Sequence, residues 1–511
     1  MDTPEAAATT VALPQPAASL PAVNRRLVDR IVSGAGWTLG SSAANQGVRL
    51  VAGLVMARLL TPHDYGLAGM ALIFSALVLI LSDLSLGAAL VQRTHITETD
   101  CSTVFWTSLG VGILLTAGGV AASPLLADFY GEPSVQPLFA VVSLTFLLTS
   151  LQTTQAALLQ RQMNFRLVGL RVSSATFLAC CAGVAAAAAG AGAWALIVQQ
   201  IVLGSVATAF LWFGTSWRPR FTYSRKSLTN LGGFGLNVFG GRVMSYLSGN
   251  VDNVLIGRFL GSRALGAYAL AFNLMLLPLS RLSLPLQDVL FPALAEIKED
   301  RSRLVSIWLR ATRVLTAVVA APMLGLIVVA PDVVHVLLGA KWNPAIPVLR
   351  VLAIVGVLQA VADPRNVLMA IDRTRLVLVF GVVEAVLIVL GVVAGLHWGI
   401  VGVAVCIAAV EVPLRLLYVR AATGAIGIPF AAFARSVGGV AWSVIAMAGG
   451  VVALHVGLIE LHVGATPRLV VVVVAGAVLY VAALWRWAPD LLTDLRSLVT
   501  TRLRPAPAAQ T

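Results

Sequence analysis

The chain has 511 residues, of which 59% are hydrophobic and 11% are charged. A soluble domain carries about twice that share of charged residues, so this composition excludes the soluble globular class. Apolar runs of about 20 residues fit one helical crossing of a bilayer, whereas a transmembrane barrel has shorter, alternating strands. The composition therefore predicts an all-α polytopic membrane protein.

The formal net charge is +13. Basic cytoplasmic loops explain such an excess in a membrane protein, so a nucleic-acid partner is not expected. The cysteines form no CxxC pair, and three of the four lie in apolar spans, so neither a disulfide framework nor a metal site is predicted. We expect no cofactor.

The chain reads as a tail, two lobes and two extra helices. Residues 1–33 form a predicted disordered cytoplasmic tail, because the start is rich in Ala, Pro and Thr and lacks a signal-peptide core. We predict about fourteen transmembrane helices, each of roughly 20 residues or more. They are expected at 35–60, 67–92, 104–126, 135–157, 167–189, 191–213, 231–258, 264–292, 308–330, 344–366, 375–397, 399–420, 436–457 and 466–487.

The predicted domains follow from this count. Six spans form an N-lobe at 34–213, a cytoplasmic connector covers 214–230, and six more spans form a C-lobe at 231–420. Helices 13 and 14 occupy 421–487, and a cytoplasmic tail covers 488–511. With a cytoplasmic N-terminus, most Arg and Lys residues fall in inside segments, which predicts that both termini are cytoplasmic.

The two lobes show a weak internal repeat. An ungapped alignment of 57–71 with 257–271 matches Arg58 with Arg258 and Gly66 with Gly266. Each segment ends the first span of a lobe and begins the next one. An even number of spans per lobe gives both lobes the same orientation, so an axis along the membrane normal can relate them.

Three arginines lie too deep in the predicted spans to reach water easily: Arg49, Arg242 and Arg281. Charged groups at that depth usually face a bundle interior or a water-filled cavity, and guanidinium matches phosphate oxygens. They are therefore candidate ligands of an anion, such as the phosphate of a substrate. The alternative is permanent neutralisation by internal carboxylates, chiefly Asp83, Asp252 and Asp288.

Other polar residues in the spans suggest a polar cavity. Amides can bind sugar hydroxyls, although they also hold helices together. Glu384 and Glu411 are isolated carboxylates at depth and are candidates for ion coupling, with a salt bridge from Glu411 to Arg415 as the alternative. The predicted polar cavity residues are Asn45, Gln46, Asn237, Asp83 and Asp252.

Enzyme signatures are lacking in the sequence. There is no P-loop and no HExxH motif, and the predicted outside loops are too short to hold a catalytic domain. The protein is therefore predicted not to be an enzyme.

Three segments carry a family resemblance. They are Ala57–Gly66 (ARLLTPHDYG), Asp83–Arg93 (DLSLGAALVQR) and Leu158–Arg166 (LLQRQMNFR), joined in the second lobe by Asp252–Gly261 (DNVLIGRFLG). They resemble the bacterial polysaccharide transporter family, in its colanic-acid and exopolysaccharide branch of Wzx-type flippases. That family belongs to the multidrug/oligosaccharidyl-lipid/polysaccharide exporter superfamily.

The resemblance implies a V-shaped, two-lobed fold in the bacterial inner membrane. It implies a flippase that moves undecaprenyl-pyrophosphate-linked oligosaccharide to the outer leaflet for exopolysaccharide or lipopolysaccharide synthesis. Alternating access driven by H⁺ or Na⁺ would power it, and polysaccharide polymerase or export machinery would be a partner. Cavity-lining arginines of related lipid II flippases carry over to Arg49 and Arg242. With this cargo, the anion expected at Arg49, Arg242 and Arg281 is the substrate pyrophosphate. A drug or cation antiporter, a membrane glycan polymerase or ligase, and a scaffold remain alternatives.

Overall fold

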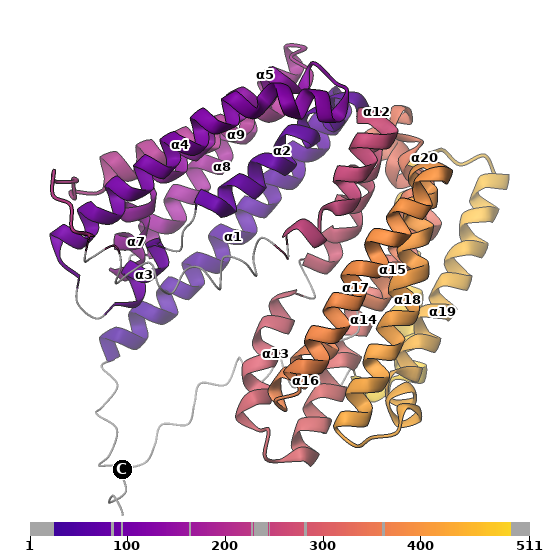
Figure 1. Cartoon of the computed structure of the whole chain (residues 1–511). Helices are drawn as coiled ribbons and strands as arrows, with labels where there is room; N and C mark the ends of the chain where they lie inside the picture. Colours follow the sequence, from indigo (N-terminus) through magenta and orange to yellow (C-terminus); the bar gives the residue numbers. More distant parts are fainter. Residues whose placement is uncertain are drawn as a thin grey trace, which may run out of the picture.

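The structure is a computed structural model. It describes residues 25–491 except 83–85, 94–95, 163–164, 226–227, 229–243, 245, 281–283 and 360–362. Within those ranges every regular element is a helix. The helices form two bundles that converge at one end, where α2 and α12 pack together, and diverge toward the other (Figure 1). The predicted all-α, V-shaped fold is confirmed.

The N-terminal bundle begins with α1, which runs from the divergent end to the convergent end (Figure 1). The fourth predicted span, 135–157, is divided among three helices, and the last of them is bent by 42° from the others. The helices are α1 (Arg25–Leu59), α2 (Pro62–Ser82), α3 (Leu86–Gln92), α4 (Glu98–Tyr130), α5 (Val135–Val142), α6 (Leu144–Ser150), α7 (Thr153–Arg161), α8 (Phe165–Ala188) and α9 (Trp194–Gly214).

The C-terminal bundle contains a break inside α12. Gly261 has φ 83° there, which fits the turn predicted between spans seven and eight. The elements are α12 (Val251–Pro278), α13 (Leu284–Glu296), α14 (Arg301–Val333), η2 (Val334–Leu338), η3 (Ala340–Trp342), α15 (Ala345–Gln359), α16 (Pro364–Ala370), α17 (Thr374–Gly395), η4 (Leu396–Trp398), α18 (Gly399–Ala425), α19 (Phe430–Glu460) and α20 (Ala465–Trp487).

Ten helices of the described chain are long and apolar enough to cross a membrane, or eleven if a bent pair forms one span. One of the ten, Thr374–Ala425, has 52 residues and contains both α17 and α18. Half of the predicted seventh span, 231–258, lies outside the described residues. The count of fourteen and the domain boundaries therefore stay predictions.

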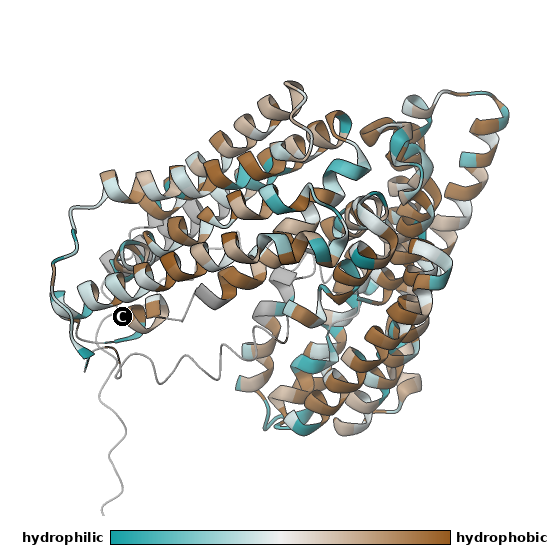
Figure 2. Cartoon of the chain, turned by 45° about the horizontal axis from the view of Figure 1, so that its top comes forward, coloured by the Kyte–Doolittle hydropathy of each residue, from teal (hydrophilic) through white to brown (hydrophobic). Residues whose placement is uncertain are grey.

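The outer faces of the bundles are apolar (Figure 2). Large side chains such as Leu378, Val474 and Trp485 are 67%, 58% and 76% exposed. Soluble proteins rarely expose apolar patches of this extent, whereas a bilayer solvates them. This surface supports a multi-pass membrane protein.

Two of the motif segments have structural roles at the divergent end. The Arg161 guanidinium donates to the carbonyls of Leu90 (3.2 Å) and Arg93, at the end of α3. Helix ends leave carbonyls without intrahelical partners, so Arg161 joins α7 to α3. The Arg161 side chain of one motif therefore holds α7 against the end of α3 in the other motif.

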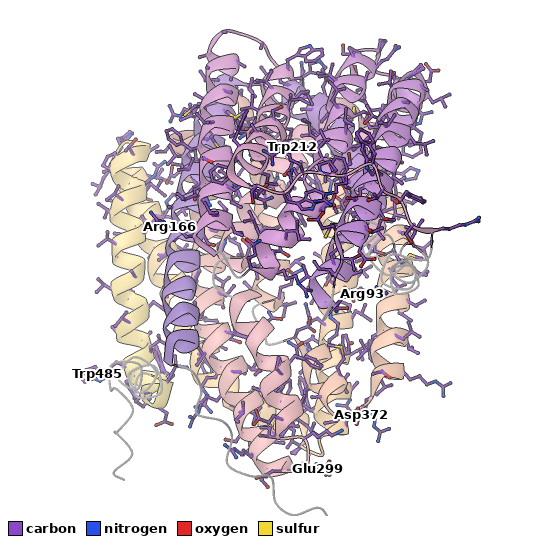
Figure 3. All side chains as sticks on the ribbon, turned by 90° about the vertical axis from the view of Figure 1, so that its left-hand side faces the viewer. Arg93, Arg166, Trp212, Glu299, Asp372 and Trp485 are labelled. Carbon is purple, nitrogen blue, oxygen red and sulfur yellow. The ribbon has the colours of Figure 1, made fainter. Side chains whose placement is uncertain are left out.

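The described part of the connector packs on the N-terminal bundle. The Arg220 carbonyl accepts from Trp106 Nε1 (2.8 Å), and Arg220 Nε lies 2.8 Å from Glu98. Phe221 stacks on Trp106 with 5.1 Å between ring centroids. In the other bundle, Lys298 Nζ and Asp372 Oδ2 form an exposed ion pair (3.1 Å) at the divergent end, where Figure 3 labels Asp372 and Glu299.

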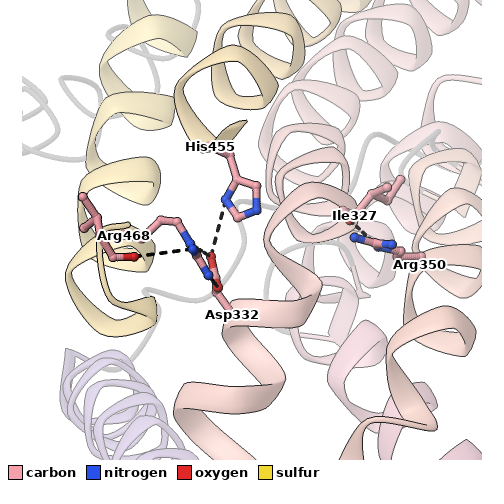
Figure 4. Close-up of polar contacts among 6 residues, drawn as sticks. Ile327, Asp332, Arg350, His455 and Arg468 are labelled. Atoms are coloured by element: carbon pink, nitrogen blue, oxygen red, sulfur yellow. Dashed lines mark hydrogen bonds and ion pairs between the residues drawn. The ribbon is translucent and has the colours of Figure 1, made fainter. Parts of the chain in front are cut away.

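Helices α19 and α20 pack against α14 through a buried polar cluster (Figure 4). Asp332 of α14 is fully buried and accepts two hydrogen bonds from Arg468 of α20, one of them 2.9 Å long from Nε. His455 Nδ1 of α19 lies 3.4 Å from Asp332 Oδ2. The extra helix pair is thus joined to the second bundle by an ion pair as well as by apolar packing.

Candidate functional site

The two bundles meet most closely at a glycine crossing. A Cβ atom on Gly66 of α2 would lie 1.7 Å from the Ser262 carbonyl oxygen, and one on Gly266 of α12 would lie 1.8 Å from the Pro62 carbonyl oxygen. Both distances are far inside van der Waals contact, so a side chain at either position would force the helices apart. The contact is reciprocal, because residues 62 and 66 correspond to 262 and 266 in the internal repeat.

The local sequence explains why α2 begins at this contact. Thr61 Oγ1 accepts from the Asp64 N–H (3.2 Å), and the Thr61 N–H donates to Asp64 Oδ2 (2.9 Å). This is a capping box, with Pro62 at the first helical position. The Thr-Pro-His-Asp motif thus fixes the helix start that brings Gly66 against the opposite bundle.

The aligned arginines also cross between the bundles. Arg58 donates from Nε to the Leu337 carbonyl (3.0 Å) and from Nη2 to the Val336 carbonyl. Arg258 places its guanidinium carbon 5.7 Å from the ring centroid of Phe129 on α4. Arg58 and Arg258 therefore occupy corresponding positions on the two sides of one contact.

The loop that follows α14 contacts the end of α1. Trp342 is fully buried, and its Nε1 donates to the Ala57 carbonyl (2.8 Å). Its ring meets that of Tyr65 edge-on, with centroids 5.3 Å apart. Lys341 Nζ donates to the Arg58 carbonyl (2.6 Å). Burial lowers the pKa of the Lys341 amine.

A short polar chain lies beside the crossing. Ser262 Oγ donates to Glu132 Oε1 (2.8 Å) and lies 2.7 Å from His63 Nδ1. Glu132 and His63 belong to the N-terminal bundle, and Ser262 belongs to the C-terminal one. We call these contacts together the interlobe seal, formed by residues 57–66, 129–132, 257–266 and 334–342.

The C-terminal bundle encloses a separate polar cavity of about 330 Å³. Its lining includes Asp252, Glu384 and Glu411, which come from three helices, together with Arg365. A water molecule occupies about 30 Å³ in the liquid, so the cavity has room for several waters or a hydrated ion. The structure therefore brings the predicted ion-coupling residues together with Asp252.

Hydrogen bonds fix the Asp252 carboxylate within this cavity. It accepts from the Tyr268 hydroxyl (2.7 Å), from the Asn253 N–H (2.8 Å) and from Asn253 Nδ2 (3.3 Å). Asp252 is thus a buried acceptor in the C-terminal bundle. No ion pair joins it to an arginine among the residues that the structure describes, so this part gives no support to Asp252 as an arginine partner.

Acidic groups outnumber basic groups around the cavity. Arg365 Nε lies 2.8 Å from Asp363, and Arg415 lies 3.5 Å from the same carboxylate. Arg415 thus pairs with Asp363 rather than with Glu411 four residues earlier. Glu384 and Glu411 both line the cavity, so two carboxyl groups share it with Asp252.

The predicted residues of α1 lie in the N-terminal bundle. Arg49 is exposed, and its Nη2 donates to Thr176 of α8 at 3.4 Å, near the limit of a hydrogen bond. No ion pair joins Arg49 to a carboxylate in the described chain. Asn45 is half-buried and Gln46 is exposed.

The remaining candidates cannot be placed. They lie outside the described residues: Asp83, Asn237, Arg242 and Arg281. Their roles as pyrophosphate ligands or cavity residues stay predictions, as does neutralisation of Arg49 by Asp83.

Sequence reasoning missed several residues, both in the interlobe seal and in the cavity of the C-terminal bundle. Arg365 lies at the end of span ten, so the charge pattern assigned it to an inside segment, but it lines the cavity from the first turn of α16. Tyr268 and Gln359 are single polar residues in apolar spans and gave a weak signal. Nothing in the local sequence distinguishes Trp342 from an exposed loop tryptophan.

Comparison with known proteins identifies the family to which this chain is similar. A family described as polysaccharide biosynthesis protein matches residues 55–347. The lipopolysaccharide biosynthesis protein WzxC of Escherichia coli is 30% identical over 376 residues, covering 72% of this chain and 76% of that protein. The succinoglycan biosynthesis transport protein ExoT of Rhizobium meliloti is 29% identical, covering 65% and 67%.

Solved structures share the fold. A lipid II flippase, MurJ, in an inward closed conformation matches with a TM-score of 0.69 at 14% identity, covering 89% of this chain and 99% of that one. An inward-facing multidrug transporter of the MATE family matches with a TM-score of 0.60 at 15% identity, covering 75% and 94%. With the family match over more than half of its length, the chain belongs to the polysaccharide biosynthesis proteins of the bacterial polysaccharide transporter family.

Proposed function

We propose that the protein is a flippase for undecaprenyl-pyrophosphate-linked oligosaccharide, serving exopolysaccharide or lipopolysaccharide synthesis. The observation that carries this proposal is the interlobe seal, in which glycine crossings join two repeat-related bundles at their convergent end. Such a contact can open while the other end closes, as alternating access requires. The protein acts as a transporter and not as an enzyme, and it delivers its cargo to polymerase or export machinery.

The seal lies at the outer side of the bacterial inner membrane in this proposal, and both termini are cytoplasmic. Support comes from the connections at the divergent end, which contain many basic residues. They include Arg93, Arg161, Arg218, Arg220, Lys298, Arg301 and Arg373. The positive-inside rule places such connections in the cytoplasm, so the structure represents an inward-facing state.

Arg49 is the proposed pyrophosphate ligand of the N-lobe, with Arg242 and Arg281 as its partners. Arg49 is exposed on α1 and makes one long hydrogen bond to a neutral hydroxyl. A guanidinium in that state keeps donors available for phosphate oxygens. Asn45 and Gln46 on the same helix would meet the glycan.

The acid-rich cavity of the C-lobe is the proposed coupling site. Its excess carboxylates, together with the fixed Asp252, create a negative field that attracts a cation. A carboxylate can take up a proton or hold a sodium ion, so H⁺ and Na⁺ are both candidates for the coupling ion. Ion uptake at this site would change the relative stability of the two access states.

A drug or cation antiporter of the same superfamily is the second candidate. The carboxylates of the C-lobe cavity favour it, because an organic cation would be attracted by the same field. The exposed Arg49 argues for an anionic cargo instead.

Deletion of the gene in its host tests the proposal. Intact cells are treated with a membrane-impermeant glycan-oxidising reagent, and the lipid-linked intermediates are then extracted. Oxidised intermediates were in the outer leaflet, and unmodified ones were in the inner leaflet. The flippase proposal requires complete repeat units to accumulate on the inner leaflet, with wild-type complementation as the control. Accumulation of single units on the outer leaflet would indicate a polymerase. Normal glycan together with altered efflux of a cationic dye would indicate the antiporter.

A further inference from the structure

The C-lobe loop formed by η2 and η3 caps the end of α1, and α1 caps η2 in return. The Ala57 and Arg58 carbonyls lie in the last turn of α1, where intrahelical partners run out. In a continuing helix the Thr61 N–H would donate to the Ala57 carbonyl, but here it donates to the Asp64 carboxylate. Trp342 and Lys341 of the opposite bundle donate hydrogen bonds to these two carbonyls.

Arg58 completes the exchange from the other side. Its guanidinium donates to the carbonyls of Val336 and Leu337, in the last turn of η2. Each helix end thus depends on the opposite lobe for its hydrogen-bond partners. No movement that separates the lobes at this end can keep these bonds, since every donor and acceptor pair spans the interface.

The corresponding contact across the repeat axis is built differently. There Arg258 faces the ring of Phe129, and Tyr130 packs on Gly257, where a Cβ would lie 2.7 Å from the ring. That side has an aromatic contact and the Ser262 hydrogen bonds instead of reciprocal capping. The Trp342 side therefore carries most of the hydrogen bonds of the seal.

From this arrangement we infer that the 334–342 loop is the latch of the outer gate, with Trp342 as its key residue. The glycine crossing sets how closely the lobes can approach, and the latch sets how long they stay closed. Both Arg58 and Lys341 are exposed, so water can replace their bonds when the gate opens. Trp342 is the buried member, and its release exposes an aromatic ring. The assignment of this gate to the outer side of the membrane rests on the proposed function, whereas the role of the 334–342 loop in holding the lobes together does not.

The experiment uses the full-length protein in cells, with its four cysteines replaced by serine. A reporter cysteine replaces Ala71, which is fully buried and has Ala271 as its repeat counterpart. A membrane-impermeant maleimide is then added outside. We expect Trp342→Ala to speed labelling about tenfold, because a lost anchor shifts the population toward the open gate. Gly266→Ala should speed labelling as well, since its Cβ cannot fit the closed seal.

Matched variants control for general loosening. Gly69→Ala lies on the same helix, and its Cβ would meet only Leu265, at 3.6 Å. Trp398→Ala removes a tryptophan of the same bundle that is 72% exposed. Both should label like the parent. Labelling rates equal to the parent in Trp342→Ala and Gly266→Ala, at normal protein levels, would overturn the inference.

A cross-linking arm covers the case in which those variants fail to fold. Cysteines in place of His63 and Ser262, whose side chains lie 2.7 Å apart, should be joined by a short bifunctional methanethiosulfonate, which forms a disulfide with each thiol and releases sulfinate. The linked protein should lose export, and a reductant should restore it. Full export by the linked protein would also overturn the inference. Labelling needs no cargo, so a wrong cargo assignment would leave the labelling results intact.

Discussion

Gly66 and Gly266 pack on each other's lobes, each against the carbonyl oxygen of a residue four positions before its partner. This reciprocity shows that the internal repeat is also a structural one at the seal. A backbone-to-backbone contact has no interlocked side chains, so the lobes can part there without repacking their cores. The glycine crossing therefore combines a close fit with easy separation, and the hydrogen bonds of the seal lie beside it.

Reporter fusions test the proposed topology. Fusions at Asp64, Gly131, Lys341 and Gly464 should read outside, because these residues lie in connections at the seal end or on its side of the membrane. Fusions at Arg225 and Arg301 should read inside, as the positive-inside rule requires. An outside reading at Arg225 would contradict the two-lobe count.

Asp332→Asn should loosen the α19–α20 pair. The change leaves the Arg468 guanidinium without its buried counterion, which costs about 3 kcal/mol for a pair of this kind. We expect a lower melting temperature in detergent and faster proteolysis between α18 and α19.

The exposed pair of Lys298 and Asp372 is the matched control. Lys298→Ala should leave the melting temperature unchanged within error, because exposed ion pairs contribute little. The double variant Asp332→Asn with Arg468→Gln should recover part of the loss. Equal melting curves for Asp332→Asn and the wild type would show that the ion pair does not hold the helices.

The sequence predicted the seal in part. The alignment of 57–71 with 257–271 identified both glycines and both arginines, because the repeat preserves residue type at equivalent positions. It could not identify Trp342, whose hydrogen bond to Ala57 joins residues 285 positions apart. Contacts between lobes depend on how two bundles dock, and no local periodicity reports that.

The C-lobe cavity shows the same limit. Glu384 and Glu411 stood out as charges within apolar spans, and the structure places them together. Arg365 did not stand out, since a basic residue at the end of a span is typical of a helix that ends at the cytoplasmic surface. It lies in the first turn of α16, which begins at Pro364, and it lines the cavity.

Glu384→Gln and Glu411→Gln should each lower export about tenfold or more and remove its response to the proton gradient. An amide keeps the size and hydrogen bonding of the carboxyl group but cannot take up an ion. Export is measured in cells with and without an uncoupler, and again with sodium replaced by potassium. If removal of sodium abolished export while the uncoupler had no effect, the coupling ion would be Na⁺ in place of H⁺.

Glu460→Gln is the control for this pair, because Glu460 is an exposed carboxylate at the end of α19. It should export and respond to the uncoupler like the wild type. Wild-type export with an unchanged uncoupler response in both cavity variants would remove the coupling role from this cavity.

Arg49→Ala should abolish export while protein levels stay normal, because the proposed pyrophosphate ligand is lost and only a 3.4 Å contact to Thr176 is broken within the fold. Arg49→Lys should restore part of the export, since charge is kept while the bidentate fork is lost. Thr176→Val is the matched control, since it removes the same contact but keeps the guanidinium. If Arg49 only neutralises Asp83, the double variant Arg49→Ala with Asp83→Ala should export, because neither charge is then left unpaired. Complementation of a deletion strain by these variants decides between the two roles, and export by Arg49→Ala alone would exclude the pyrophosphate role.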